Sequence, residues 1–287
     1  MRFVSLAAAL AAATLLAAPV SARTWKQDWT VGAHPVVHVG TNDARVRVHR
    51  GAPGRVSTTI EYTVSVWGMH TLVKSPEVEM SRNGDVVTVS ARSHMAGVIF
   101  GGMSERFDID VTVPPACDVQ VRTGDGSITL EPVTGAVDLQ TGDGHIVAHG
   151  AAGRVRLWTG DGGIDADGLD GALEAHTGDG HVKVAGRFDR LDVRSSDGRV
   201  DATIARGSVL VQPWSVQAGD GSVTLRIPRN LQAVLDASTG DGGIRVDLPI
   251  AGLDHRSHHE FRGQLNGGTV PLRVHTGDGG VTLTLSE

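Results

Sequence analysis

The chain has 287 residues, of which 40% are hydrophobic and only 4% aromatic, and its formal net charge is −6. An acidic chain is a poor partner for nucleic acid or an anionic membrane surface, because both are negatively charged themselves. With 38 glycines and few aromatic rings, the core must consist of small aliphatic side chains and the backbone must turn often.

The first residues have the pattern of a cleaved signal peptide. Met1-Arg2 supplies a positive charge, an apolar run extends from Phe3 to Pro19, and Val20-Ser21-Ala22 places small residues at a cleavage site. The run is short for a membrane-spanning helix. We therefore expect residues 1–22 to be a signal peptide, and an exported chain without a transmembrane segment, either periplasmic or extracellular at the cell surface.

The chain has one cysteine, Cys117, next to Pro114-Pro115. In an oxidising compartment a lone cysteine cannot form an internal disulfide. An intermolecular disulfide is one interpretation, and a buried, inert thiol is the one we favour.

Residues 23–117 predict β-structure without a repeat. Asn83-Gly84 predicts a hairpin in which both residues take positive φ. An open end of a stack of strands exposes apolar surface and unpaired backbone groups. We therefore interpret this segment as a β-rich cap that also begins the stack. Runs typical of strands occur at 36–39, 45–50, 56–67 and 107–113.

The remaining residues, 118–287, are organised around a repeated turn, Thr-Gly-Asp-Gly. Polar Thr129 between apolar Ile128 and Leu130 illustrates the alternation beside each turn, which predicts a strand with one inward face. A second such strand precedes each turn. The first five copies begin 18 residues apart at Thr123, Thr141, Thr159, Thr177 and Ser195, and later copies begin at Ala218, Thr239 and Thr276.

One such unit cannot fold alone. It buries about four small aliphatic side chains, roughly 6–12 kcal/mol, whereas ordering 18 residues costs roughly 18–36 kcal/mol. Units stacked in register can fold together, because stacking adds hydrogen bonds between units and closes the core. The sequence therefore predicts an all-β, single-chain β-solenoid of the β-helix or β-roll type with coils of about 18 residues. The alternative is an antiparallel β meander with Asp-Gly hairpin turns.

The unit from Thr239 to Thr276 departs from this spacing, because it contains an insertion around residues 253–261. Insertions in solenoids usually emerge as loops, often on the binding face. We expect this one to be a solvated polar loop.

The turn aspartates are candidate calcium ligands. In a stack they would align at about 4.8 Å intervals, as in calcium-binding glycine-rich repeats. A single such turn per unit is half of that pattern, and each aspartate could instead cap its own turn while glycine supplies positive φ. We favour the structural interpretation, assign no metal, and leave calcium open. The residues are Asp125, Asp143, Asp161, Asp179 and Asp197.

Histidines form three further groups. His145 and His181 share one position in the repeat, but Gly163 lies between them. This predicts a separation of about 10 Å, too large for a shared metal. His176 and His275 share another position without being on adjacent coils. The insertion offers the ligand types His255, His258, His259, Asp254 and Glu260.

Catalytic motifs of hydrolases, zinc proteases and phosphate-binding loops do not occur in the sequence. Trp158 and Trp214 lie next to the turn region and are candidate contacts for a sugar, with a core or edge role as the alternative. We assign no catalytic, cofactor-binding or metal residues and no cofactor.

Three features carry a resemblance to a known family. They are the run Phe107–Val113 ending at Pro114, the segment Val119–Ile128 with its Thr-Gly-Asp-Gly turn, and Gly263–Gly268 before the last repeat. With the repeated units, they resemble the bacterial β-strand-repeat family of unknown function labelled "putative adhesin". The resemblance implies a β-helix-like stack and an envelope or exported location, and it carries no catalytic residues.

These observations favour a non-enzymatic exported β-repeat protein, an adhesin-like binding scaffold of the bacterial cell envelope. Its partner would be an envelope or surface component, protein or glycan, and not nucleic acid. The alternatives are a periplasmic structural or stress-related scaffold and a polysaccharide-acting β-helix enzyme. The enzyme would need a cleft with convergent acids and aromatic subsites.

Overall fold

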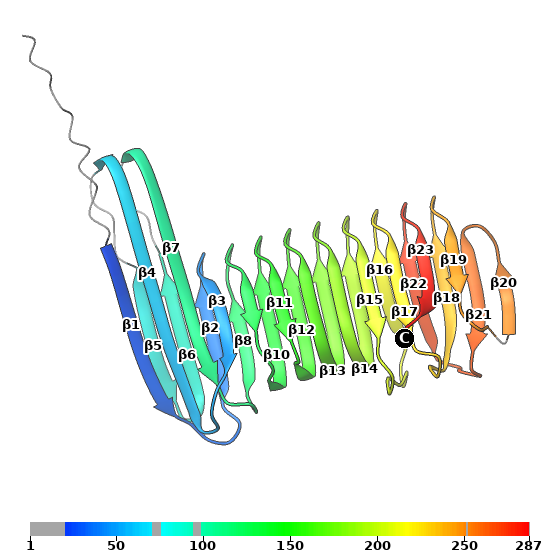
Figure 1. The fold of residues 1–287 in the computed structure, drawn as a ribbon, viewed down its shortest axis with the longest axis horizontal. Helices are drawn as coiled ribbons and strands as arrows, with labels where there is room; N and C mark the ends of the chain where they lie inside the picture. The colour runs from blue at the N-terminus through cyan, green and yellow to red at the C-terminus, as the bar shows by residue number, and fades with distance from the viewer. Residues whose placement is uncertain (1–20, 71–75, 94–98, 251, 287) are drawn as a thin grey trace, which may run out of the picture.

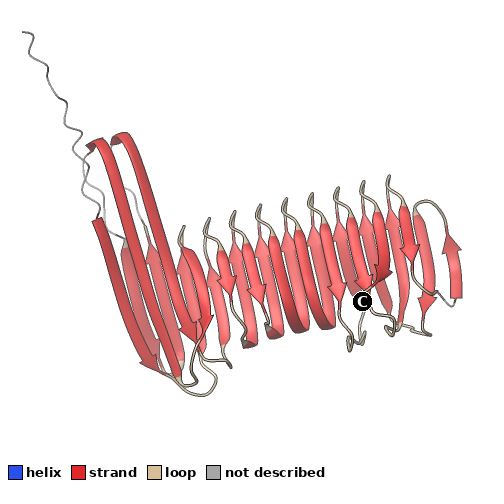
Figure 2. Ribbon diagram, in the orientation of Figure 1, coloured by secondary structure: helices blue, strands red, loops and turns tan. Residues whose placement is uncertain are grey.

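The computed structural model describes residues 21–70, 76–93, 99–250 and 252–286. These residues form 23 strands and, within those ranges, no helix, as Figure 2 shows. The described residues thus contain no helix with the length and apolar character needed to cross a membrane. The prediction of an all-β fold is confirmed. Most of the expected signal peptide lies outside the described residues, and Ser21 and Ala22 begin β1.

Strands before the Thr-Gly-Asp-Gly turns pair in one ladder, and strands after the turns pair in a second ladder. The first ladder contains β8 (Asp118–Arg122), β10 (Thr134–Thr141), β12 (Ala152–Thr159), the second halves of β13 (Ile164–Thr177) and β14 (Val182–Ser195), and β16 (Trp214–Ala218). The second contains β9 (Ile128–Leu130), β11 (Ile146–His149), the first halves of β13 and β14, β15 (Val200–Ile204) and β17 (Val223–Ile227). Figure 1 shows these strands stacked side by side along the molecule. The inward side chains of the two ladders share one core.

Pairing within both ladders is parallel. In the first ladder Val137 lies between Val119 and Val155, so its partners are 18 residues away on either side. All three valines are at most 2% exposed, as the alternating pattern predicts. An antiparallel meander is therefore wrong for these strands, because its neighbours would run in opposite directions.

The turn threonines connect successive units. Thr159 Oγ1 donates to the carbonyl of Gly144 in the preceding unit (2.9 Å) and accepts from its own Gly162 N–H (3.2 Å). Thr141 makes the same pair of bonds with Gly126 and Gly144. Each buried hydroxyl thus closes its own turn and fastens that turn to the one before.

The expectation that the aspartates cap these turns and that glycine supplies positive φ is wrong. Asp143 and its equivalents point into solvent, while the buried threonine makes the capping bonds. Gly144 has no left-handed φ. It is glycine because an added Cβ would overlap the carbonyl oxygen of Gly126. Left-handed glycines occur instead at the opposite turns, as at Gly153 (φ 119°) and Gly171 (φ 126°).

The N-terminal segment begins both ladders and covers their end. Parallel to β8 and β9 lie β2 (Val36–Thr41) and β3 (Arg45–Arg50). Outside them, β1 (Ser21–Thr30), β4 (Arg55–His70) and β7 (Ile99–Val113) pair antiparallel, as do β5 (Glu77–Asn83) and β6 (Val86–Arg92). A domain boundary at residue 117 stays a prediction.

The predicted β5–β6 hairpin is present, with its turn one residue later than expected. Asn83 pairs with Val86, so the turn residues are Gly84 and Asp85. Gly84 takes a left-handed φ of 61°, whereas Asn83 does not. Asp85 Oδ1 accepts a hydrogen bond of 2.8 Å from Gly32 N–H. The turn is therefore tied to the chain just before β2.

The C-terminal strands do not follow chain order. β22 (Pro271–Thr276) lies between β16 and β18 (Ala233–Thr239), and β23 (Val281–Leu285) lies between β17 and β19 (Ile244–Asp247). Figure 1 shows these last two strands between earlier ones. The insertion, expected as a loop, forms a hairpin of β20 (Gly252–Arg256) and β21 (Glu260–Leu265). β21 pairs antiparallel with β18 and covers the end of the first ladder.

Cys117 and Trp214 belong to the core, each with 0% exposure. Burial raises the pKa of the Cys117 thiol to about 12, which keeps it protonated and unreactive. The expectation of a buried, inert thiol is confirmed. Trp214 Nε1 donates to the Asp189 carbonyl at 3.3 Å, which satisfies its one polar group.

We expect Thr159→Val to lower the free energy of unfolding by about 1–3 kcal/mol, because it leaves the buried Gly144 carbonyl and the half-buried Gly162 N–H without their partner. Urea unfolding followed by circular dichroism measures the change. Thr159→Ser is the control, since Ser195 makes the same two bonds naturally. Equal stability of the valine and serine variants would contradict the role given to the hydroxyl.

Candidate functional site

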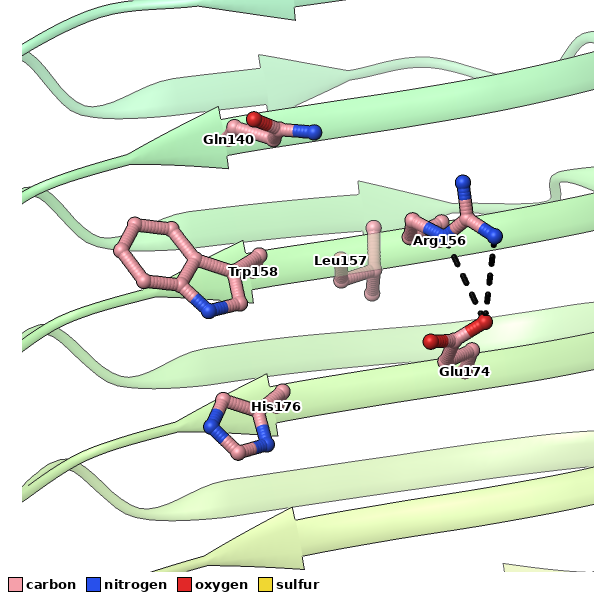
Figure 3. Close-up of a pocket in the computed structure, with 6 residues that line it drawn as sticks. All are labelled: Gln140, Arg156, Leu157, Trp158, Glu174 and His176. Carbon is pink, nitrogen blue, oxygen red and sulfur yellow. Dashed lines mark hydrogen bonds and ion pairs between the residues drawn. The ribbon is translucent and has the colours of Figure 1, made fainter.

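A shallow groove runs across the outward face of the first ladder. Figure 3 shows Gln140, Trp158 and His176 in one row on β10, β12 and β13, with Arg156 and Glu174 in the adjacent row. The hollow that they line has a volume of about 260 Å³. We call this surface the groove face.

The register of the strands creates these rows. Residues 18 apart lie side by side, as Gln140, Trp158 and His176 do. Inward Leu157 is fully buried, so its neighbours Arg156 and Trp158 must both point outward. The groove face therefore repeats at the strand spacing of about 4.8 Å along the molecule.

Small residues between large ones deepen the groove face. Ala172 lies between Arg154 and Arg190 in a third row, which crosses β12, β13 and β14. A methyl side chain between two long guanidinium side chains leaves a second hollow of about 150 Å³. This second hollow therefore exists because alanine occupies a position at which the two neighbouring strands carry arginine.

Trp158 is the aromatic residue of this face. Its exposed fraction is 43%, which is unusual for so large an apolar side chain. The sequence proposed Trp158 and Trp214 together as candidate contacts, but only Trp158 is available, since Trp214 is buried.

Arginines and carboxylates surround Trp158. Arg156 donates from Nε and Nη2 to Glu174 Oε2, both at 3.3 Å. Arg194 pairs with Asp192 at 3.2 Å. Among the described residues, Arg154 and Arg190 make no ion pair. The groove face therefore offers an aromatic surface, free guanidinium donors and carboxylate acceptors to a bound molecule.

The turn aspartates lie apart from one another. Across the described ranges, they bring no three carboxylate oxygens within 4.8 Å of one another. Their side chains extend separately into solvent beyond the turns.

The expected separation of about 10 Å between His145 and His181, too large for a shared metal, is wrong. Their ring centroids are 5.5 Å apart. Gly163, between them, has no side chain to keep the rings apart, so both lean over it. Each Nε2 lies near Asp165 Oδ2, at 2.8 Å for His145 and 3.3 Å for His181.

Sequence reasoning missed Asp165 because it compared only residues at the same repeat position. Asp165 lies two residues beyond Gly163, on the same outward side of the middle strand. Partial burial raises the pKa of Asp165, but the hydrogen bonds from both histidines outweigh it and leave the pKa below its ordinary value. The carboxylate is therefore ionised at neutral pH.

The other histidine groups do not converge in the described part of the chain. His275 bonds to Ser238 Oγ at 2.9 Å and lies far along the ladder from His176. In the insertion, His255 lies 3.7 Å from Glu260, while His259 Nδ1 bonds to the Gly242 carbonyl at 3.1 Å. The rings of His258 and His259 lie edge to face with centroids 4.8 Å apart, but among the described residues the insertion brings no three ligand atoms within 4.8 Å of one another.

A separate charged cluster lies where β3 meets β7. His49 contacts Glu131 Oε1 at 3.0 Å and Asp110 Oδ1 at 3.2 Å, and Arg47 Nε donates to Asp110 at 2.6 Å. The bond from Arg47 lowers the pKa of Asp110, and the bond from His49 lowers that of Glu131. A general acid needs a raised carboxyl pKa, so this arrangement suits an ion-pair network that joins the N-terminal strands to the repeats.

The sequence pattern of the Toastrack DUF4097 family matches residues 46–284. This chain belongs to that family. The match spans β3, the cluster at His49, the groove face and the whole set of repeats, in agreement with the resemblance drawn from the Thr-Gly-Asp-Gly units. No curated protein matches this Toastrack chain.

Several solved structures align with most of this chain at low sequence identity. A "putative lipid binding protein" from Parabacteroides distasonis has a TM-score of 0.45 and 11% identity, over 91% of this chain and 96% of its own. A "putative adhesin" from Parabacteroides merdae has a TM-score of 0.40 and 13% identity, over 91% and 96%. A "putative cell adhesion protein" from Clostridium sporogenes has a TM-score of 0.31 and 11% identity, over 92% and 100%. The family assignment rests on the sequence match.

We expect His49→Gln to destabilise the protein more at low pH than at high pH. Bonding to Glu131 raises the pKa of His49 above 6.5. A raised folded-state pKa contributes stability that is fully present below the unfolded value and is lost as pH rises through the folded value. Urea unfolding of wild type and variant between about pH 5 and 8 measures the difference.

His258→Gln, which alters an exposed histidine in the end hairpin, is the control for this pH series. A stability difference between wild type and His49→Gln that stays constant with pH would contradict the role of the charged imidazole.

Proposed function

We propose that this chain is an exported, non-enzymatic binding scaffold of the bacterial cell envelope. In this proposal the parallel ladders form a solenoid with coils of about 18 residues, and the groove face binds an envelope glycan. The single observation that carries the proposal is the exposed Trp158 within a row of polar side chains on a rigid ladder.

The chemistry of the groove face suits a sugar polymer. A sugar ring has an apolar face that packs against an indole and hydroxyls that bond to charged and amide side chains. Trp158 supplies the first kind of contact, while Gln140, His176 and Glu174 supply the second within the same hollow. A face that repeats at regular intervals suits a ligand that repeats as well.

An enzymatic role is less well supported by the same residues. Glu174 is bonded to Arg156 and Asp192 to Arg194, so both carboxylates are already engaged in ion pairs. Hydrolysis of a glycosidic bond needs two available carboxyl groups on either side of that bond. The groove is also shallow and open to water.

We expect Trp158→Ala to weaken glycan binding by about tenfold or more, because an aromatic residue at the centre of a contact usually dominates the affinity. The purified chain is tested on an array of peptidoglycan fragments, lipopolysaccharide-derived glycans and capsular polysaccharides. Dissociation constants for the bound glycans are then measured by biolayer interferometry.

Val211→Ala is the control for Trp158→Ala, because Val211 is 72% exposed and lies in the connection from β15 to β16, outside the groove face. Arg156→Gln and Arg226→Gln form a second matched pair, since Arg226 is exposed on β17 of the second ladder. Binding that survives Trp158→Ala, or the absence of binding to every glycan, would contradict the proposal.

The location is tested with a copy that carries a C-terminal epitope tag behind a specific protease site. We expect the added protease to remove the tag from intact cells, because an adhesin-like scaffold presents its groove face outside. Immunoblotting measures the tag before and after treatment. Removal only after the outer membrane is opened would favour the periplasmic structural scaffold instead.

A further inference from the structure

We propose that His145, Asp165 and His181 form a binding site for a transition-metal dication of the Zn²⁺ class. The site lies on the second ladder, beside the turns, and so differs from the groove face on the first ladder. It would join three successive units of the repeat through one ion.

The three side chains already converge. Their ligand atoms all lie within 4.8 Å of one another, and Asp165 Oδ2 is 2.8 Å from one Nε2 and 3.3 Å from the other. Zinc bonds of about 2.0–2.1 Å in tetrahedral geometry place ligand atoms roughly 3.3–3.4 Å apart. Small rotations of the three side chains are enough to reach that geometry.

The backbone holds the ligands in place from three adjacent strands. Ile146 N–H donates to the Gly163 carbonyl at 3.0 Å, and Ile164 N–H donates to the His181 carbonyl at 2.8 Å. His145, Gly163 and His181 therefore occupy consecutive rungs with a fixed spacing. A site built on paired strands loses little freedom when an ion binds.

Gly163 is what allows the two imidazoles to meet. A Cβ at this position would lie 2.5 Å from Cε1 of His181 and 2.8 Å from Cε1 of His145. Any larger residue would push the rings apart. The equivalent Gly280 has no such constraint, since its added Cβ meets only the Gly243 carbonyl oxygen at 3.4 Å.

The donor set selects the class of ion. Two imidazole nitrogens and one carboxylate oxygen suit Zn²⁺, Ni²⁺ or Cu²⁺, whereas Ca²⁺ and Mg²⁺ prefer oxygen ligands. The side chains of His145, Asp165 and His181 are 38%, 39% and 52% exposed. A fourth position is therefore open to water or to a group from another molecule.

A charged neighbour and a second His–Asp pair lie beside the site. Lys183 is the cross-strand neighbour of Asp165, and its positive charge opposes a cation, though only weakly beside solvent. His149 pairs with Asp167 at 2.9 Å in a separate contact on the same two strands. Among the described residues no third ligand joins this pair, so His149 is a suitable control position for the metal test.

The test uses isothermal titration of tag-free protein with ZnSO₄, and with CoCl₂ for its visible spectrum. We expect one ion per chain, a tetrahedral Co²⁺ spectrum, and a rise in Tm on adding Zn²⁺. Asp165→Asn and His181→Gln should each weaken Zn²⁺ binding at least tenfold, while His149→Gln should leave it unchanged.

Gly163→Ala tests the geometry without removing a ligand, and Gly280→Ala is its matched control. We expect only Gly163→Ala to weaken Zn²⁺ binding, with circular dichroism to verify that both variants fold. His181→Gln alters an exposed side chain and provides the decisive result if Gly163→Ala fails to fold. No Zn²⁺ binding by the wild type, or binding unaffected by His181→Gln and Asp165→Asn, would overturn the proposal, whatever the glycan result.

Discussion

The close approach of successive Thr-Gly-Asp-Gly turns is the constraint on which the rest of this structure depends. A buried threonine hydroxyl donates to the preceding unit and accepts from its own turn, while glycine lets the two backbones come together without a Cβ between them. Both requirements are met only when the units are stacked in register. The turns therefore set the parallel pairing of the strands on either side of them, and with it the continuous aliphatic core.

This register also builds the surfaces on which the proposals rest. Residues at one repeat position form a row at the strand spacing of about 4.8 Å. Each unit can carry a different side chain at that position, so large and small residues become neighbours in one row. Ala172 between two arginines makes a hollow, and Gly163 between two histidines lets their rings meet. In both cases the smallest residue of the row creates the site, and the larger residues around it supply the chemistry.

Strands that break the repeat cover the N-terminal end of both ladders and the far end of the first ladder. At the N-terminal end, antiparallel strands lie outside β2 and β3. At the other end, the hairpin of β20 and β21 pairs with β18, and β22 returns to lie between β16 and β18. A returning strand pairs on both edges, so the C-terminal unit gains backbone partners on two sides.

Local sequence determined the strands, their inward residues and the turns between them, because alternation and turn chemistry act over a few residues. Val137 and Ile128, for example, are buried as their pattern predicts. Tertiary structure alone decided that threonine caps the turns, that the insertion at 253–261 becomes a covering hairpin, and that β22 is inserted out of chain order. It also decided that the imidazoles of His145 and His181 come together above Gly163 and that both approach the Asp165 carboxylate. The physical reason is that the repeat period specifies backbone spacing, whereas side-chain reach and the order of strands depend on contacts between residues distant in the chain.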